Sequence, residues 1–177
     1  MTKHARFTSN GFRLAVLALA IAGSGSAIAA SAVANSTSTV VTPINITKSA
    51  DLAFGSFAAG ATPGTVTVTP GGTRTAGGGV TAVTSTATAA KFDVTGLAGM
   101  GYSIDVAAST LSDGGGNSMT LTPISDLTAS ASTANTLTSG TLTGGAQSIY
   151  VGGVLAVAAN QAAGTYSGNV TATVNYN

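Results

Sequence analysis

Apolar and polar positions alternate with a period of two along much of this chain. The pattern is clearest near the C-terminal end, where even positions from Tyr166 to Tyr176 hold apolar or small residues and odd positions hold Thr, Ser or Asn. Successive side chains of a β-strand point to opposite faces of a sheet. The alternation therefore predicts a half-buried strand over residues 165–176, whose core-facing side chains include Tyr166, Val170, Val174 and Tyr176.

Shorter alternating runs occur throughout the chain after residue 35, and many contain the β-branched residues Thr and Val, which suit a pleated sheet. These runs lie at 65–69, 92–94, 102–106, 119–121 and around 149–151. Between them lie Gly-rich clusters, and glycine tolerates the positive φ that tight turns require. Turns are accordingly expected at 63–64, 70–72, 77–79, 99–101, 113–117, 144–145, 152–153 and 163–164. Because no helical period is found after residue 35, the pattern predicts an all-β sandwich or barrel.

The N-terminus has a different pattern, in which basic residues precede an uncharged apolar run, Leu14–Ala22, and a stretch of small residues. This order is typical of a secretory signal peptide. The run is too short for a membrane span, which needs ~20 apolar residues, so no integral membrane segment is expected in the mature chain. We predict a signal peptide over residues 1–34, and the pattern leaves open cleavage after Ala29, Ala30 or Ala34.

Cleavage leaves a chain of ordinary single-domain size. We divide it into an N-terminal extension or donor-type strand over residues 35–48 and one β-sandwich domain over residues 49–177. The sequence has no cysteine. An exported protein is free to form disulfides, so stability here must come from packing and from hydrogen bonds within the sheets.

The predicted cleavage also changes the charge of the protein. It removes three of the six basic residues and the single histidine, which leaves three basic side chains against five aspartates and a formal net charge of −2. Three scattered cations cannot neutralise a row of nucleic-acid phosphates or hold the protein on an anionic membrane. We predict an exported protein of the periplasm, cell surface, fimbrium or extracellular space, without a nucleic-acid partner.

The side chains available for chemistry are few, because residues 35–177 contain no His, Cys or Glu. Triads that depend on histidine and zinc sites built from His or Cys are excluded. Asp93 and Asp105 could form a glycosidase-like carboxylate pair, but both fall on the polar side of predicted strands. Asp113 and Asn117 could bind calcium, although their Gly-rich spacing favours a plain turn. We therefore predict a protein that is not an enzyme, with no catalytic residue, no cofactor and no metal site.

Two blocks of the sequence carry a resemblance to a known family. One is 51–57 (DLAFGSF), and the other consists of 150–153 (YVGG) and 162–176 (AAGTYSGNVTATVNY). Together they resemble a family of secreted bacterial domains of unknown function, which is similar in turn to spore coat U domains and archaic chaperone-usher pilins. The resemblance spans roughly residues 44–177 and implies an immunoglobulin-like antiparallel β-sandwich.

The same resemblance implies a mode of assembly. In pilins the N-terminal extension of one subunit fills a groove in the next, a form of β-strand addition. The matching segment here is 39–47, in which Val40, Ile44 and Ile46 share one parity, and Tyr176 matches the penultimate aromatic residue of pilins. The cysteines frequent in pilins are missing from this chain. Self-complementation by the chain's own first strand fits the sequence equally well.

Charge patterning favours a protein that works in an assembly. No charged side chain occurs from Leu127 to the end of the chain, and an uncharged β-rich edge is a template for further strand pairing. We predict a structural surface subunit, fimbrial or matrix-forming, that self-associates or pairs with related subunits. A periplasmic chaperone and an outer-membrane usher are its expected partners. The alternative is a monomeric secreted module for adhesion or ligand binding.

Overall fold

The structure is a computed structural model that describes residues 29–177 and divides the chain into two units. The first unit ends at Ser38; its described residues, 29–38, have exposed side chains and no regular secondary structure. The second unit, Thr39–Asn177, holds the strands described below. The predicted signal peptide lies almost wholly outside the described residues. No helix within residues 29–177 is long and apolar enough to cross a membrane.

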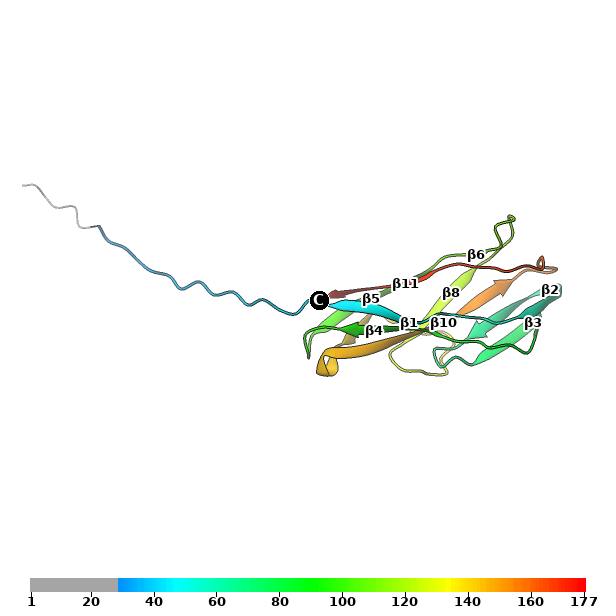
Figure 1. Ribbon diagram of the computed structural model, residues 1–177, viewed down its shortest axis with the longest axis horizontal. Coiled ribbons are helices and arrows are strands. Elements are labelled where there is room, and N and C mark those ends of the chain that lie inside the picture. The colour runs from blue at the N-terminus through cyan, green and yellow to red at the C-terminus, as the bar shows by residue number, and fades with distance from the viewer. Residues whose placement is uncertain (1–28) are drawn as a thin grey trace, which may run out of the picture. The chain divides into compact units, whose positions relative to one another are not determined.

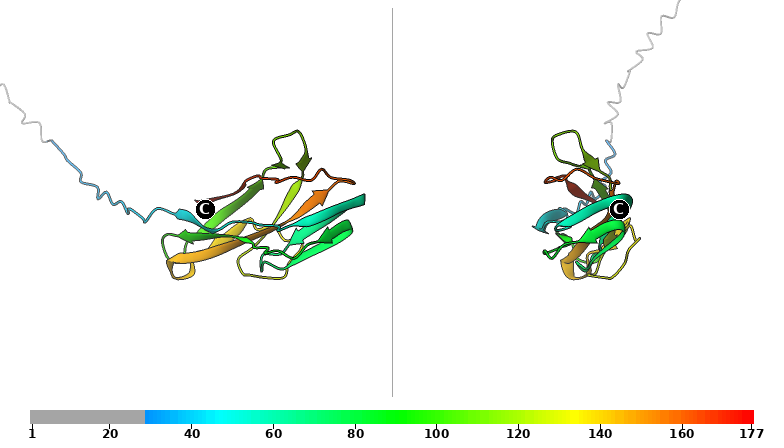
Figure 2. Two further views of the ribbon diagram at one scale, coloured as in Figure 1. Left: turned by 45° about the vertical axis from the view of Figure 1, so that its right-hand side comes forward. Right: turned by 90° about the vertical axis from the view of Figure 1, so that its right-hand side faces the viewer.

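The larger sheet of the second unit has the strand order β1–β4–β10–β2–β3, and β8 pairs with the other edge of β10 (Figures 1 and 2). All of its pairings are antiparallel. Its strands are β1 (Asn45–Ala50), β2 (Phe57–Val68), β3 (Arg74–Ala82), β4 (Ala90–Thr95), β8 (Leu121–Asp126) and β10 (Ala146–Val157).

The smaller sheet has the order β11–β5–β9 and is also antiparallel. Its strands are β5 (Gly101–Ala108), β9 (Ser139–Thr141) and β11 (Val170–Tyr176), and a short 3-10 turn, η1 (Thr143–Gly145), follows β9. A separate hairpin pairs β6 (Leu111–Ser112) with β7 (Ser118–Met119). The two sheets pack together through their apolar faces, so the predicted all-β antiparallel sandwich is confirmed.

The core between the sheets consists of two apolar clusters. The first gathers buried side chains of β4, β5, β10 and β11, including Phe92, Tyr102 and Ile149. The second gathers side chains of β2, β3, β7, β8 and the end of β10, including Val66 and Leu155. Each fully buried large apolar side chain stabilises the fold by about 1.5–3 kcal/mol. The parity expected for 65–69 and 92–94 holds, because Val66, Val68, Phe92 and Val94 are buried.

Three of the predicted turns lie inside strands instead. Gly152 and Gly153 occupy the middle of β10, while 63–64 belongs to β2 and 77–79 belongs to β3. β10 changes its partner on one edge from β4 to β2 next to these two glycines, and β8 lies along its other edge. A Cβ at Gly152 would overlap the Val68 carbonyl oxygen. Glycine is therefore required here because three strands converge, and not because the chain turns.

The two ends of the domain also differ from the expected boundaries. β11 begins at Val170, so the predicted strand is shorter and Tyr166 lies in the segment before it. The chain leaves the small sheet after β5 for the β6–β7 hairpin. The segment before β11 is paired by a hydrogen bond from the Ser109 N–H to the Asn169 carbonyl oxygen and by an isolated bridge between Ser112 and Ser167. At the other end, β1 pairs with β4 from Asn45 onward. The sheet therefore begins a few residues before the expected domain start at residue 49.

Candidate functional site

A groove of about 1000 Å³ runs between two stretches of chain that are distant in sequence. One wall is the end of β1 and its continuation into β2, within residues 48–59. The opposite wall is the segment 161–170, which leads into β11. Between the walls lie apolar side chains, among them Phe92, Leu111, Met119, Leu121 and Leu155.

The first wall links β1 to β2 within the larger sheet and changes its pairing partner at a bend around Gly55. Ala53 still pairs with Thr88 through two N–H···O bonds of 2.9 Å, which extends the β1–β4 ladder. At Gly55 the backbone takes φ +68°, where a side chain would collide with the Arg74 guanidinium. The Phe54 side chain is buried, with 7% of its surface exposed.

Arg74 holds this bend in place from β3. Its Nη1 donates to the carbonyl oxygens of Phe54 and Ser56 at 3.0 and 3.2 Å and to Ser85 Oγ at 3.0 Å. Its Nη2 donates to the Val83 carbonyl oxygen at 2.7 Å. A cation that donates to several carbonyl oxygens forms charge-assisted hydrogen bonds, which are stronger than neutral ones. Arg74 therefore ties the first wall to the 83–85 segment, in addition to the backbone pairing of Ala53 with Thr88 and of Ser56 with Val83.

The second wall is held by the β6–β7 hairpin and by hydrogen bonds within its own segment. Ser167 exchanges backbone hydrogen bonds of 2.8 and 2.9 Å with Ser112 of the β6–β7 hairpin. The Tyr166 hydroxyl donates to the Ala162 carbonyl oxygen at 2.8 Å and accepts a hydrogen bond from Gln161 Nε2 at 2.9 Å. These hydrogen bonds fasten the wall to the hairpin and fix its own first residues.

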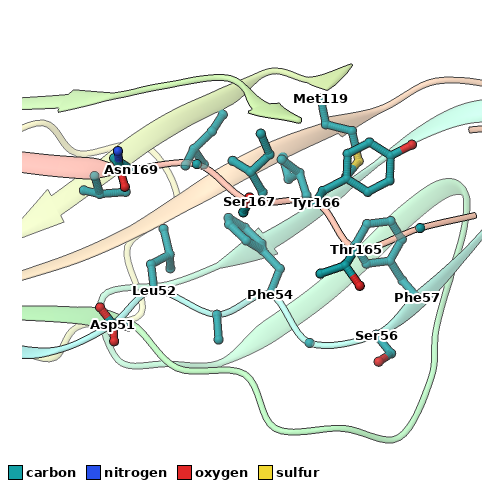
Figure 3. Close-up of a pocket in the computed structure, with 18 of the residues that line it drawn as sticks. Asp51, Leu52, Phe54, Ser56, Phe57, Met119, Thr165, Tyr166, Ser167 and Asn169 are labelled. Atoms are coloured by element: carbon teal, nitrogen blue, oxygen red, sulfur yellow. The ribbon is translucent and has the colours of Figure 1, made fainter. Parts of the chain in front are cut away.

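Apolar side chains from both walls converge on the groove (Figure 3). Leu52, Phe54 and Phe57 extend toward the segment that carries Tyr166 and Ser167, and the Tyr166 ring lies next to Met119. Phe54 and Met119 belong to the second core cluster, against which Leu52, Phe57 and Tyr166 also pack. The groove is consequently an opening into the apolar core, with polar side chains such as Lys48, Asp51 and Asn169 also in its lining.

The groove also lies at the seam between the edges of the two sheets. β1 is the terminal strand of the larger sheet and β11 is the terminal strand of the smaller one, and these two strands do not pair with each other. Within the described part of the chain, Leu52 and Gly168 make no backbone–backbone hydrogen bond. Successive residues of an antiparallel strand direct their backbone groups to alternate sides. Ala53 pairs with Thr88 and Ser167 pairs with Ser112, so the backbone groups of the adjacent residues Leu52 and Gly168 point the opposite way, into the groove.

The residues proposed as an assembly strand are divided between two environments. Val40 is 95% exposed and precedes β1. Ile44 and Ile46 are partly buried against the first core cluster, and Ile46 lies opposite Val94 in the β1–β4 ladder. In this structure Ile44 and Ile46 therefore belong to the domain, and the free part of the segment lies upstream of them.

The residues assigned to the C-terminal core strand also occupy different places. Val174 is buried in the first cluster, with Tyr176 packed against it, while Val170 packs against both clusters. Tyr166 belongs to the second wall of the groove. The Tyr176 hydroxyl accepts a hydrogen bond from the Leu97 N–H at 2.7 Å and donates to the Thr42 carbonyl oxygen at 2.9 Å.

The aspartates serve local structure in this fold. Asp93 on β4 and Asp105 on β5 belong to different sheets. The Asp93 carboxylate accepts hydrogen bonds from Ser49, from Ser148 at 2.7 Å and from Lys91, whose Nζ lies 3.1 Å away. Hydrogen bonds from Ser49 and Ser148, with the Lys91 interaction, lower the pKa of Asp93 to about 2. This cluster connects β1, β4 and β10 on the larger sheet.

Asp113 likewise has the contacts of a turn residue. It accepts hydrogen bonds from Asn117 Nδ2 at 2.6 Å, from the Gly115 N–H at 2.8 Å and from the Asn117 N–H at 3.0 Å. These donors, Asn117 foremost, lower the pKa of Asp113. Among residues 29–177 no group of three or more His, Cys, Asp or Glu side chains is placed to hold a metal ion.

Sequence patterns point to only part of this groove. The 51–57 and 162–176 blocks supply most of both walls, and each was noticed for its resemblance to a family. Arg74 and Leu111 carry no local signal, and the alternation over 119–121 predicts only that Met119 lies in a strand. The roles of all three in the groove depend on which strands fold next to the walls. The Gln161 amide and the Ser112–Ser167 bridge were missed for the same reason.

Comparison with known proteins assigns a family. The chain matches the family described as "Domain of unknown function (DUF4402)" over residues 44–176. The match covers the whole sandwich from the residue before β1 to the end of β11. No curated protein and no solved structure matches the chain.

Proposed function

Because this chain belongs to the DUF4402 family, whose description assigns no activity, we propose its function from its own groove. The protein is a non-enzymatic structural subunit of the cell surface that assembles by accepting a β-strand between the segment 51–57, which follows β1, and the segment 161–169, which precedes β11. It is exported after cleavage of the N-terminal segment and builds a fimbrial or matrix-type assembly. A periplasmic chaperone and an outer-membrane usher fit this role as partners.

The observation that carries the proposal is a groove over the apolar core, bounded by the segment that follows edge strand β1 and the segment that precedes edge strand β11. A strand placed there can bond to the backbone groups of Leu52 or Gly168 while its alternate side chains cover Phe54, Met119 and Leu155. Strand addition derives affinity from backbone hydrogen bonds and specificity from pockets for alternate side chains. Unpaired backbone groups and apolar side chains in the groove would supply both.

The chain also carries a suitable strand to occupy such a groove. In the described residues the large apolar side chains that are exposed are Val33, Val40, Val41 and Val83, and three of them precede β1. The segment 30–42 otherwise consists of Ala, Ser, Thr and Asn. It has no charge and is rich in β-branched residues, which favour extended backbone. We propose this segment, upstream of Ile44, as the strand that is added.

A binding experiment tests the proposal on the mature protein. An excess of a synthetic peptide of residues 30–42 should bind the domain and reduce the size of its assemblies, as measured by light scattering after gel filtration. Leu52→Asp should abolish peptide binding, because it places a charge among the apolar side chains of the groove. Thr171→Asp is the matched control, since Thr171 is exposed and does not line the groove.

Two outcomes would contradict the proposal. One is a wild-type protein that is monomeric at all concentrations and indifferent to the peptide, which would favour a monomeric binding module. The other is equal peptide binding by the Leu52→Asp variant and the control, both checked for folding by thermal melts. Export is tested separately, by mass spectrometry of the protein from its native envelope. The mature chain should begin between Ala30 and Asn35, and retention of Met1 would refute the export step.

A further inference from the structure

We infer that the outer edge of β3 pairs with the β3 edge of a second copy, in an antiparallel register about a two-fold axis through Gly78. β3 is the terminal strand of the larger sheet at the end opposite β1 (Figure 1). The inference goes beyond the proposed function, because the residues of β3 do not line the groove. It gives the subunits a second contact, side by side, that needs no strand from elsewhere.

Hydrogen bonds at both ends of the β2–β3 ladder show which backbone groups of β3 face outward. The Thr69 N–H donates to the Thr73 carbonyl oxygen at 3.0 Å, and the Val83 N–H donates to the Ser56 carbonyl oxygen at 3.0 Å. Opposite residues of an antiparallel ladder alternate between hydrogen-bonded and non-hydrogen-bonded pairs. Counted inward from these two bonds in the observed register, the even residues of β3 direct their backbone groups away from β2. They are Arg74, Ala76, Gly78, Val80 and Ala82.

These outward groups are available for pairing. Within the described part of the chain, β3 pairs with β2 alone, and the even residues of β3 make no other backbone–backbone hydrogen bond. Most of the strand is exposed, and only Val80 is buried. Natural proteins usually protect such an edge with charges or proline. β3 contains no proline, and its one charged side chain, Arg74, is bonded within its own chain.

The sequence of β3 is complementary to a second copy of itself. Residues 75–81 read TAGGGVT, which is nearly the same in both directions around Gly78. In a two-fold contact each residue meets its counterpart in both directions, so an axis at Gly78 places similar residues opposite each other. The opposed pairs are Thr75 with Thr81, Ala76 with Val80, and Gly77 with Gly79.

This register also matches the direction of the backbone groups. Because Gly78 is an even residue, the axis places even residues of one copy opposite even residues of the other, and these are the residues whose groups face outward. A shift by one residue would oppose outward groups to inward ones and lose the ladder. Gly78 itself has φ +66°. Its place on the axis means that both copies bring the same bend to the contact.

The contact adds hydrogen bonds and covers an apolar side chain. On each side of the axis, Arg74 can pair with Ala82 and Ala76 with Val80, and each pair exchanges both N–H···O bonds. The two Arg74 side chains lie at opposite ends of the paired strands, so no like charges meet.

Val83 supports the same partner. Of the exposed large apolar side chains in the described residues, Val83, at 47%, is the one that lies downstream of β1. It directly follows β3, and in the two-fold register it would lie opposite Thr73 of the second copy. The contact therefore covers apolar surface that the domain leaves in solvent, and a second copy is the partner that the edge fits.

Cysteine trapping tests the register, because the chain has no cysteine of its own. Thr75 and Thr81 are exposed and would face each other in a non-hydrogen-bonded pair, which brings their Cβ atoms within reach of a disulfide. Mature Thr75→Cys is mixed with mature Thr81→Cys under mild oxidation, and linked dimer is measured on non-reducing gels. The mixture should give about tenfold more linked dimer than either variant alone, because two copies of one variant hold their sulfurs roughly 20 Å apart. Thr171→Cys mixed with Thr81→Cys is the matched control, since Thr171 is exposed on β11.

A pair of charge variants tests the contact without oxidation. Thr75→Lys/Thr81→Lys opposes like charges across the axis, whereas Thr75→Lys/Thr81→Glu opposes unlike charges. Within one chain the two positions are roughly 20 Å apart, about twice the Debye length at physiological ionic strength, so the monomers should melt alike. The two variants should differ about tenfold in dimerisation constant, measured by analytical ultracentrifugation, because both cross-strand pairs change from repulsive to attractive.

Both experiments use a Leu52→Asp background, which blocks the groove and separates this contact from the proposed function. Linked dimer in the mixture alone, with stronger dimerisation of the Lys/Glu variant, supports the inference. Equal linkage by a single-cysteine variant and by the mixture would refute the register about Gly78. If neither experiment detects a dimer while protein with an intact groove assembles and binds the 30–42 peptide, the β3 contact is refuted and the proposed function stands. A β3 dimer in a protein that ignores the peptide supports this inference and refutes the proposed function.

Discussion

Val174→Asp tests whether β11 presents one face to the core. Val174 is 8% exposed, belongs to the first core cluster and lies opposite Ile104. The substitution removes a buried apolar side chain and places a carboxylate where no donor is available, which should lower the free energy of unfolding by roughly 3–5 kcal/mol. At about 2–4 °C per kcal/mol for a domain of this size, the melting temperature should fall by about 10 °C.

Thr171→Asp is the matched control on the opposite face of the same strand. Thr171 is exposed and pairs with Ala107, so the change should stay within about 0.5 kcal/mol. Thr173 is a poorer control, because it lies opposite Asp105 and a second carboxylate there would repel the first by about 0.2–1 kcal/mol. Circular dichroism melts at neutral pH measure all three variants. Equal destabilisation by Val174→Asp and Thr171→Asp would refute the assignment of the two faces.

Three further predictions follow from the contacts of single side chains. The pKa of Asp93 is lowered from 3.8 to about 2, so its contribution to stability is complete above pH 3.8 and is lost as the pH falls through 2; Asp93→Asn should remove this part of the acid sensitivity in melts between pH 7 and 2. Arg74→Ala should weaken binding of the 30–42 peptide, whereas Arg74→Lys should retain part of the wild-type affinity. If calorimetric titration gives the two variants the affinity of the wild-type protein, the role of the guanidinium is contradicted. Gly152→Ala should destabilise the fold by several kcal/mol because its Cβ overlaps the Val68 carbonyl oxygen, whereas Gly77→Ala has only a contact of 3.8 Å and should be mild in denaturant titrations.

The Gly-rich clusters show where sequence reasoning about turns succeeds and where it fails. Gly99 and Gly114 lie outside strands and have positive φ, as their predicted turns require. Gly152 and Gly153 produce the same local signal but lie inside β10, where they allow three strands to approach one another. A local sequence cannot separate these two uses of glycine, because the second depends on backbone from other parts of the chain.

The alternation of apolar and polar side chains determined the fold class, because a period of two indicates a β-strand whatever its position in the sheet. It indicated the faces of β4 and of the second half of β2, and the scarcity of His, Cys and Glu limited the available chemistry. It did not determine the extent of β11, since strand pairing requires a partner and β5 ends at Ala108. Residues 165–169 therefore keep the alternating pattern of a strand, although β5 does not extend far enough to pair with them.

The groove was decided by the tertiary structure alone. Sequence marks 51–57 and 162–176 as unusual, but the space between them exists because β1 ends one sheet, β11 ends the other and the two do not pair. Likewise, the pattern placed Val40, Ile44 and Ile46 on one side of a strand, while packing incorporated Ile44 and Ile46 into the domain and left Val40 exposed. The side of a strand on which a residue lies is set by its neighbours in the sequence. Whether an edge of a sheet stays without a pairing strand depends on where all the other strands of the chain fold.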